Sequence, residues 1–110
     1  MRKPLPAAPL HIALALLDGE QHGYAIMRNV EEMSGGAVKM GPGTLYGTLN
    51  RLVEDGLIVE TTDRTERDDN ERRRYYQLTG EGRTVALAEL SRLQSLVRRA
   101  EGHLPGGAIA

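Results

Sequence analysis

The sequence contains no cysteine, tryptophan or phenylalanine, and its only aromatic side chains are four tyrosines. The absence of cysteine excludes disulfide bonds and thiolate metal sites, and it fits a reducing compartment. The formal net charge is −1, from 14 basic and 15 acidic side chains, so the chain lacks the basic excess common in nucleic-acid-binding proteins. Any binding of that kind must depend on local clusters of charge rather than on the overall field.

The sequence also lacks an apolar run long enough to cross a membrane. The longest run covers about residues 12–17, whereas a spanning helix needs roughly 20 residues. Arg2 and Lys3 precede an apolar stretch as in a signal peptide, but prolines interrupt it and no small-residue cleavage site follows. We therefore expect a cytoplasmic protein with no membrane partner. The length of 110 residues predicts one domain.

No pattern typical of a catalytic, metal or cofactor site is present. The histidines His11, His22 and His103 share no ligand-like spacing. The glycine-rich segment 35–43 is not followed by the Gly-Lys-Ser/Thr of a phosphate-binding loop. No nucleophile–base pair is recognisable either. We expect no metal, no cofactor and no enzymatic activity.

Hydrophobic spacing predicts three helices in the first half of the chain, after a flexible arm at residues 1–9. Residues 10–18 are apolar on nearly every side, which indicates a helix buried all round and in contact with a dimer partner as well as its own core. A second helix is expected at about residues 22–34. The third should begin at Pro42, which suits a first helical turn, and stop at Gly56.

The hydrophobic period then changes to that of a β-hairpin. Residues 57–62 and 72–79 are β-branched, aromatic and roughly alternating, which predicts two short strands joined by a charged loop. Tyr75 and Tyr76 are expected to be packing residues, with Tyr76 facing the core.

A long final helix is predicted at residues 80–101, followed by a flexible tail at residues 102–110. Its apolar residues recur at steps of four and three, the spacing of a seam that packs against another helix. A second copy of the chain is the simplest cover for this seam, so we expect a homodimer through the first and last helices. The expected interface residues are Leu14, Leu17, Ala86, Leu90, Leu93 and Val97.

The order of these elements is helix, helix, helix, strand, strand, helix. A mainly α fold in which the third helix is followed by a small β-hairpin is the winged helix-turn-helix plan. We therefore assign residues 10–79 to a winged helix-turn-helix DNA-binding domain and residues 80–101 to dimerisation.

The third predicted helix carries Gly47 in its second turn, although glycine in a helix costs roughly 0.5–1 kcal/mol relative to alanine. Leu45, Leu49, Leu52 and Val53 form an apolar stripe and leave Gly47 near the centre of the opposite face. Such a face can approach the DNA major groove closely, where arginine pairs with guanine and asparagine with adenine. The alternative interpretation is that this face of the helix is exposed to solvent and contacts no DNA. The face consists of Gly43, Thr44, Gly47, Asn50, Arg51 and Glu54.

Basic side chains around this helix are candidates for phosphate contacts. Arg72 and Arg74 share one face of the second predicted strand, because alternate residues of a strand point the same way. Lys39 comes just before the third helix. The alternatives are a solvated loop lysine and wing arginines that are neutralised by the acidic residues of the preceding loop.

Three blocks occur in order, HGYAIM at 22–27, GPGTLYGTLNRLVEDGLI at 41–58 and RRRYYQLTGEGR at 72–83. Together they resemble the signature blocks of the PadR family of bacterial transcriptional regulators. The resemblance implies a homodimeric repressor on a pseudo-palindromic operator, with the third helix in the major groove and the wing at the flanking backbone or minor groove. It also places Tyr24 and Tyr46 at or near the DNA backbone. The single last helix is similar to that of the short subfamily.

Departures from the family pattern leave the operator sequence open. Gly47 often corresponds to proline in the family, and Asn50 to a basic residue. Some relatives bind planar or phenolic effectors at the dimer interface, but the tyrosines of this chain all lie between residues 24 and 76. Any small-molecule effector site is therefore expected to be aliphatic or absent. A winged-helix protein–protein interaction module without DNA binding is the alternative function, favoured by the near-zero net charge.

Overall fold

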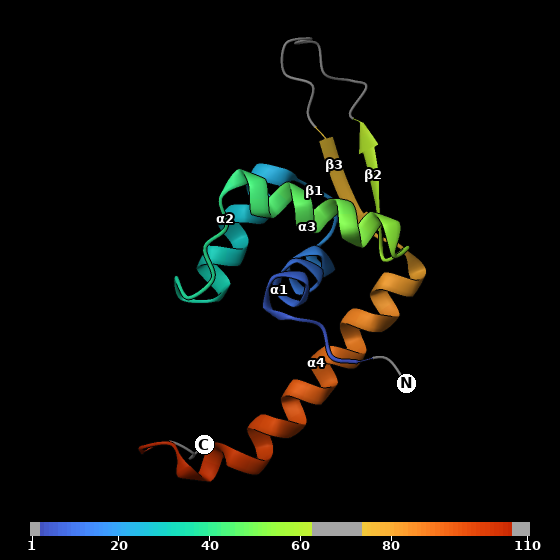
Figure 1. Cartoon of the computed structure of the whole chain (residues 1–110). Coiled ribbons are helices and arrows are strands. Elements are labelled where there is room, and N and C mark those ends of the chain that lie inside the picture. Colours follow the sequence, from blue (N-terminus) through green and yellow to red (C-terminus); the bar gives the residue numbers. More distant parts are fainter. Residues whose placement is uncertain (1–2, 63–73, 107–110) are drawn as a thin grey trace.

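The computed structural model describes residues 3–62 and 74–106. It is mainly helical, with one small sheet (Figure 1), which confirms the predicted fold class. Two short 3₁₀ turns, at Leu16–Asp18 and Glu101–His103, follow the first and last helices. The helices and strands are α1 (Ala7–Ala15), β1 (Gln21–His22), α2 (Gly23–Met33), α3 (Pro42–Glu54), β2 (Ile58–Thr62), β3 (Arg74–Leu78) and α4 (Gly80–Ala100).

Helix α1 begins at Ala7 rather than at residue 10, so part of the predicted flexible arm is helical. Pro9 does not prevent this, because it lies in the first turn, where backbone N–H groups have no partner within the helix. The prediction of burial on every side is only partly right. Ile12 and Leu16 are buried, whereas Leu14 and Leu17 are half-buried. Both leucines therefore keep some surface for a further contact.

The sheet has three antiparallel strands in the order β1-β3-β2. The predicted hairpin of β2 and β3 is confirmed, and β1 adds a third strand that the prediction missed. Its residues Gln21 and His22 pair with Tyr76 and Tyr75, which ties the start of α2 to the wing. Two residues are too few to produce a recognisable alternation in sequence.

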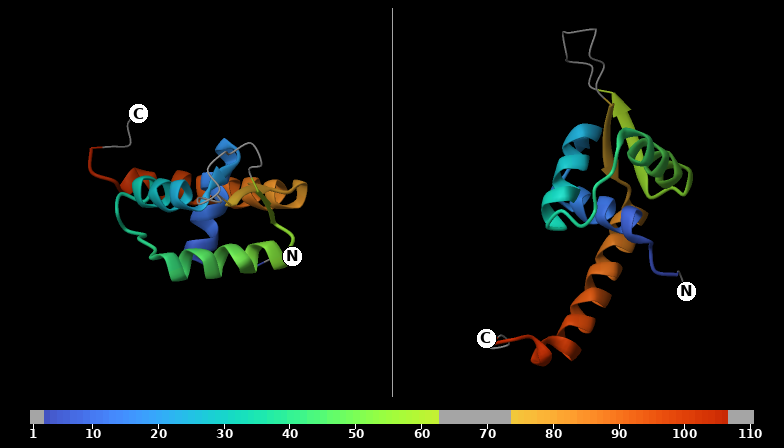
Figure 2. Two further views of the ribbon diagram at one scale, coloured as in Figure 1. Left: turned by 90° about the horizontal axis from the view of Figure 1, so that it is seen from above. Right: turned by 60° about the vertical axis from the view of Figure 1, so that its left-hand side comes forward.

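The core lies between α1, α2, α3 and the inner face of the sheet. Tyr76 is fully buried, as predicted, and it is among the largest buried side chains. In α3 the predicted apolar stripe is buried except for Val53, which is 37% exposed. Figure 2 shows α1 enclosed by the other helices and α3 at one side of the body. The core residues include Ile12, Leu16, Ile26, Val30, Leu45, Leu49, Leu52, Leu57, Ile58 and Tyr76.

Helix α4 packs against α1 through its first half, while its second half extends away from the body (Figures 1 and 2). Ala86 is completely buried within the protomer. The prediction that it lies in a dimer interface is therefore wrong, because no surface of Ala86 remains for a second copy. Leu93 is half-buried, and Leu90 and Val97 are exposed. None of the helices in the described ranges is both long and apolar enough to span a bilayer.

The start of α4 is fixed against β2 by a close backbone contact at Gly82. A Cβ atom on Gly82 would overlap the carbonyl group of Leu57. Thr79 holds both segments together, since its hydroxyl donates to the Gly56 carbonyl (2.7 Å) and accepts from the Gly82 N–H (2.9 Å). The Thr79 N–H donates to the Leu57 carbonyl at 3.0 Å. This junction sets the direction in which α4 leaves the domain.

Candidate nucleic-acid interface

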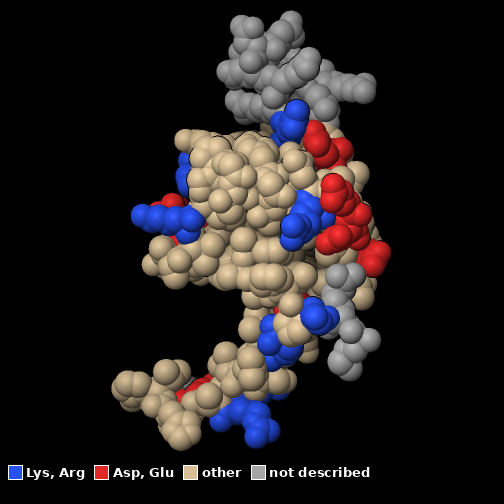
Figure 3. All heavy atoms as spheres, in the orientation of Figure 1, with Lys and Arg blue, Asp and Glu red and all other residues tan. Residues whose placement is uncertain are grey.

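The outer face of α3 is open to solvent over its whole length. Gly43, Thr44, Tyr46, Gly47, Asn50 and Arg51 are all exposed. Figure 3 views this side of the molecule, where the surface over α3 is largely uncharged and basic and acidic groups gather near its edges. The predicted face is thus available for contact with another macromolecule.

Neither the backbone conformation nor a close contact within the described chain requires glycine at Gly43 or Gly47. Both have ordinary helical backbone angles, and an added Cβ would meet nothing within 4 Å at either position. Gly23 and Gly82 differ, since a Cβ there would collide with Tyr46 and with Leu57. The loss of helix propensity at Gly43 and Gly47 is therefore not compensated inside the protomer.

Polar side chains flank this strip of glycines. Asn50 and Arg51 form no hydrogen bond or ion pair within the part of the chain that the structure describes. Thr48 is engaged instead, because its hydroxyl donates to the Thr44 carbonyl at 2.7 Å. Arg51 and Glu54 are the charged residues on this face, so the helix itself has almost no net charge there.

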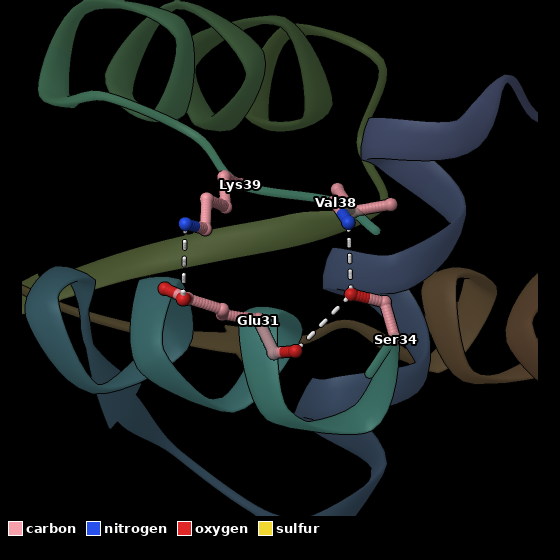
Figure 4. Close-up of polar contacts among 4 residues, drawn as sticks. All are labelled: Glu31, Ser34, Val38 and Lys39. Carbon is pink, nitrogen blue, oxygen red and sulfur yellow. Dashed lines mark hydrogen bonds and ion pairs between the residues drawn. The ribbon is translucent and has the colours of Figure 1, made fainter. Parts of the chain in front are cut away.

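The turn between α2 and α3 sets the position of Lys39 (Figure 4). The Ser34 hydroxyl accepts from the Val38 N–H at 2.9 Å and donates to the Glu31 carbonyl at 3.2 Å. Lys39 Nζ lies 3.8 Å from Glu31 Oε2, and both side chains are well exposed. Such a surface pair is worth less than about 1 kcal/mol. Lys39 can therefore exchange Glu31 for a phosphate at little cost.

Tyr24 lies in the first turn of α2, and the side chain of Tyr46, which belongs to α3, reaches the same helix end. Tyr24 is 63% exposed, which excludes a half-buried packing role. The Tyr46 hydroxyl rests against Gly23, the first residue of α2, and a Cβ on Gly23 would overlap it. The His22 Nδ1 accepts from the Ala25 N–H at 3.2 Å and caps the same helix end. Helix N-termini favour negative charge, so the Tyr46 hydroxyl lies where an anion would be stabilised.

The wing contributes Arg74, while Arg72 and the acidic loop residues Asp68, Asp69 and Glu71 lie outside the described residues. The Arg74 side chain is 61% exposed, and its Nε lies 3.4 Å from Glu60 Oε2 of β2. Glu60 differs from the predicted partners of Arg74, which were the acidic residues of the loop and not those of the facing strand. The pairing of the two strands explains the contact. It places Glu60 opposite Tyr76 and Thr62 opposite Arg74, so Glu60 and Arg74 are diagonal neighbours on one face of the sheet.

No metal centre is found in the described ranges, where no group of three or more His, Cys, Asp or Glu side chains converges. The exposed third helix, the preceding helix that supports it and the antiparallel wing define a winged helix-turn-helix protein. Residues 13–88 match the sequence profile of the transcriptional regulator PadR-like family. The chain belongs to this family, which implies a role in transcriptional control rather than in catalysis.

Known proteins agree with this assignment. The chain is 35% identical to the protein named "Transcriptional regulator Rv3488" of Mycobacterium tuberculosis (strain ATCC 25618 / H37Rv), over 87% of this chain and 84% of that protein. A PadR family transcription regulator from Clostridium difficile R20291 has a similar fold, with a TM-score of 0.68, 24% identity and coverage of 83% of this chain and 94% of that one. Bacillus subtilis PadR in complex with operator DNA also has a TM-score of 0.68, at 24% identity, covering 79% of this chain and 48% of that one.

Proposed function

We propose that this protein is a sequence-specific DNA-binding repressor that acts as a homodimer on a pseudo-palindromic operator. The observation that carries the proposal is the open strip of Gly43 and Gly47 on α3, which nothing in the described chain requires. A helix surface without Cβ atoms can approach the floor of the major groove, where side chains would otherwise collide with base edges. The loss of roughly 0.5–1 kcal/mol per glycine is then offset by contacts with DNA.

The side chains around this strip divide into base-reading and phosphate-binding groups. Asn50 and Arg51 are exposed and have no partner among the described residues, and their side chains match adenine and guanine in the major groove. Thr44 lies on the same face, one turn before Thr48. The groups suited to phosphates are Tyr24, Tyr46, Lys39 and Arg74, together with Arg72 as a sequence-based expectation. Bacillus subtilis PadR, which has the same fold, was solved with operator DNA.

A second copy of the chain is the proposed cover for the distal half of α4. Leu90, Leu96 and Val97 are each about half exposed, and neighbouring apolar side chains exposed on one helix mark a surface for contact with another protein. An aliphatic concavity of about 280 Å³ also lies at its end, lined by Leu96, Val97, Ala100, Glu101 and Leu104. Twofold pairing through this surface and through Leu14 and Leu17 would bring two α3 helices to one duplex.

Substitution of Leu90 by glutamate is expected to dissociate this dimer, because it places a charge in an interface that must be dehydrated. Sedimentation velocity at micromolar concentration should show the wild-type chain as a dimer and the Leu90→Glu variant as a monomer. Ser91→Glu, which adds the same charge at the neighbouring exposed position, should remain dimeric. If Leu90→Glu still sedimented as a dimer, this face of α4 would not be the interface.

The proposed function is tested by fluorescence anisotropy with a duplex from the region upstream of the chain's own gene and a scrambled duplex of equal length. Specific binding is expected with a Kd of about 10⁻⁸ M or lower at physiological salt. It should weaken steeply as salt is raised, because phosphate contacts release counterions. Equal binding to both duplexes would argue against the proposal.

Two arginine variants separate base reading from phosphate binding. Arg51→Ala is expected to lose discrimination at one base position, by about 1–3 kcal/mol. Arg74→Ala should weaken binding to every sequence and reduce the salt slope by about one. Competition assays with single-base operator variants distinguish the two patterns. Identical specificity profiles in wild type and Arg51→Ala would remove Arg51 from the base-reading set.

The second candidate function is a winged-helix protein–protein interaction module without DNA binding. It is favoured by the near-neutral outer face of α3 and by a net charge of −1. In that case no duplex would bind with the salt dependence described above.

A small-molecule effector is a further part of the proposed regulation. The concavity at the end of α4 is aliphatic, so a ligand bound there is expected to be aliphatic rather than planar and aromatic.

A further inference from the structure

The hydroxyl group of Tyr76 is a buried polar group that neither the fold nor the proposed interface uses. Tyr76 is fully buried, and its hydroxyl has no hydrogen-bond partner among the described residues. Buried hydroxyls in native proteins are nearly always paired, and an unpaired one destabilises the fold. A phenylalanine would fill the same space without that loss. We therefore looked for a function of this hydroxyl in the state in which the protein is bound to a partner.

The groups nearest to this hydroxyl in the sheet belong to the wing. Glu60 of β2 is the direct cross-strand partner of Tyr76. Arg74 lies two residues before Tyr76 in β3, so both side chains point to the same face of the sheet. Cross-strand partners have Cβ atoms about 4.5–5.5 Å apart, and the Tyr76 hydroxyl and the Arg74 guanidinium both lie close to the Glu60 carboxylate. In the free protein it pairs with Arg74, whose Nε lies at 3.4 Å.

The protonation state of Tyr76 suits a donor role. Burial raises its pKa above the usual value, and the negative charge of Glu60 raises the pKa further. The guanidinium of Arg74 lowers this pKa, since it is close to the hydroxyl although it forms no hydrogen bond of acceptable geometry with it. The net direction is upward, so the hydroxyl keeps its proton at neutral pH and can donate it in a hydrogen bond.

We propose that Tyr76 is a positioning residue whose hydroxyl is a reserve donor for Glu60, which allows Arg74 to leave Glu60 for a DNA phosphate. This inference rests on the proposed DNA-binding function. When Arg74 turns to a phosphate, the Glu60 carboxylate, whose side chain is 34% exposed, would lose its partner. A hydrogen bond from Tyr76 to the carboxylate replaces that contact, and such charge-assisted bonds are short and strong. The exchange gives the buried Tyr76 hydroxyl a partner in the bound state.

The exchange can be tested without DNA, because removal of Arg74 imitates its departure. Thermal unfolding is measured at one protein concentration for wild type, Tyr76→Phe, Arg74→Ala and the double variant. In the wild-type background Tyr76→Phe should leave Tm unchanged or raise it. In the Arg74→Ala background, where Tyr76 now donates to Glu60, the same substitution should lower Tm by several degrees. Equal effects in the two backgrounds would overturn the inference. Tyr75→Phe, on the opposite face of β3, is the matched control and should show no such difference.

Operator affinity supplies the second readout. Tyr76→Phe should weaken operator binding about tenfold, the effect of losing one hydrogen bond to a charged group. Glu60→Ala should strengthen binding, since Arg74 is then already free, and Tyr76→Phe should have no effect in that background. An equal loss in the Glu60→Ala background would show a merely structural role and overturn the inference. If the stability coupling is present but no duplex binds, the proposed function fails while the exchange of Glu60 partners stands. If the operator binds and the coupling is absent, the inference alone fails.

Discussion

Replacement of Gly47 by leucine is expected to abolish specific duplex binding while leaving the fold as stable as before, or more so. Gly47 is an exposed helical residue, and an added Cβ atom there meets nothing within 4 Å, so we expect the helix to accommodate a larger side chain that points to solvent. Leucine is also the better helix former, by up to about 1 kcal/mol. On DNA the same side chain would occupy the space between the helix backbone and the base edges. We expect operator affinity to fall about 100-fold or more, roughly 2.7 kcal/mol, in anisotropy titrations.

Two further variants make the Gly47 result interpretable. Gly47→Ala should give an intermediate loss of affinity with a small gain in Tm, because a single methyl group fills part of the same space. Val53→Leu enlarges a partly exposed side chain on the same helix, away from the proposed contact, and should bind as the wild type does. Full operator affinity in Gly47→Leu would show that this face of α3 does not approach DNA closely.

Replacement of Gly82 by alanine is expected to have the largest effect on stability among the glycine-to-alanine changes in the described residues. The added Cβ would overlap the Leu57 carbonyl, which also accepts the Thr79 N–H. No flexible side chain can move aside, because the obstacle is backbone held by hydrogen bonds on both sides. We expect a loss of about 3–5 kcal/mol, measured by chemical denaturation. This is a large part of the 5–15 kcal/mol that is typical of a whole domain.

Gly80→Ala is the matched control for that loss. Gly80 lies two residues earlier, at the start of the same helix, and an added Cβ there would meet nothing within 4 Å. It should therefore be neutral or stabilise the protein by about 0.4–1 kcal/mol through the unfolded state. Equal destabilisation by both substitutions would mean that the Gly82 contact with Leu57 is not what fixes α4.

The elements that have a clear hydrophobic period, or a proline or glycine at their ends, could be predicted from the sequence. Pro42 and Gly56 bracket α3 as expected, and the change to a two-residue period located β2 and β3. The open face of α3 followed from the helix geometry alone, since Gly47 and the apolar stripe lie on opposite sides.

The remaining features depend on contacts between segments far apart in sequence. The strand β1 has no pattern of its own and exists because Tyr75 and Tyr76 offer it an edge. Ala86 fits a helical seam equally well whether α1 or a second copy covers it, and only the packing of α4 on α1 decides. Gly82 and Gly47 look alike in sequence, yet one is required by a backbone contact and the other is not. The pairing of Arg74 with Glu60 likewise depends on the register of the hairpin.

The most direct test of the account is an in vitro selection of random duplexes with the wild-type protein, sequenced after several rounds. If the outer faces of two α3 helices meet one duplex, the enriched sequences should contain an inverted repeat, with half-site centres about one helical turn, or 10–10.5 base pairs, apart, or a multiple of that distance. A pool that remains indistinguishable from the starting library would contradict the account.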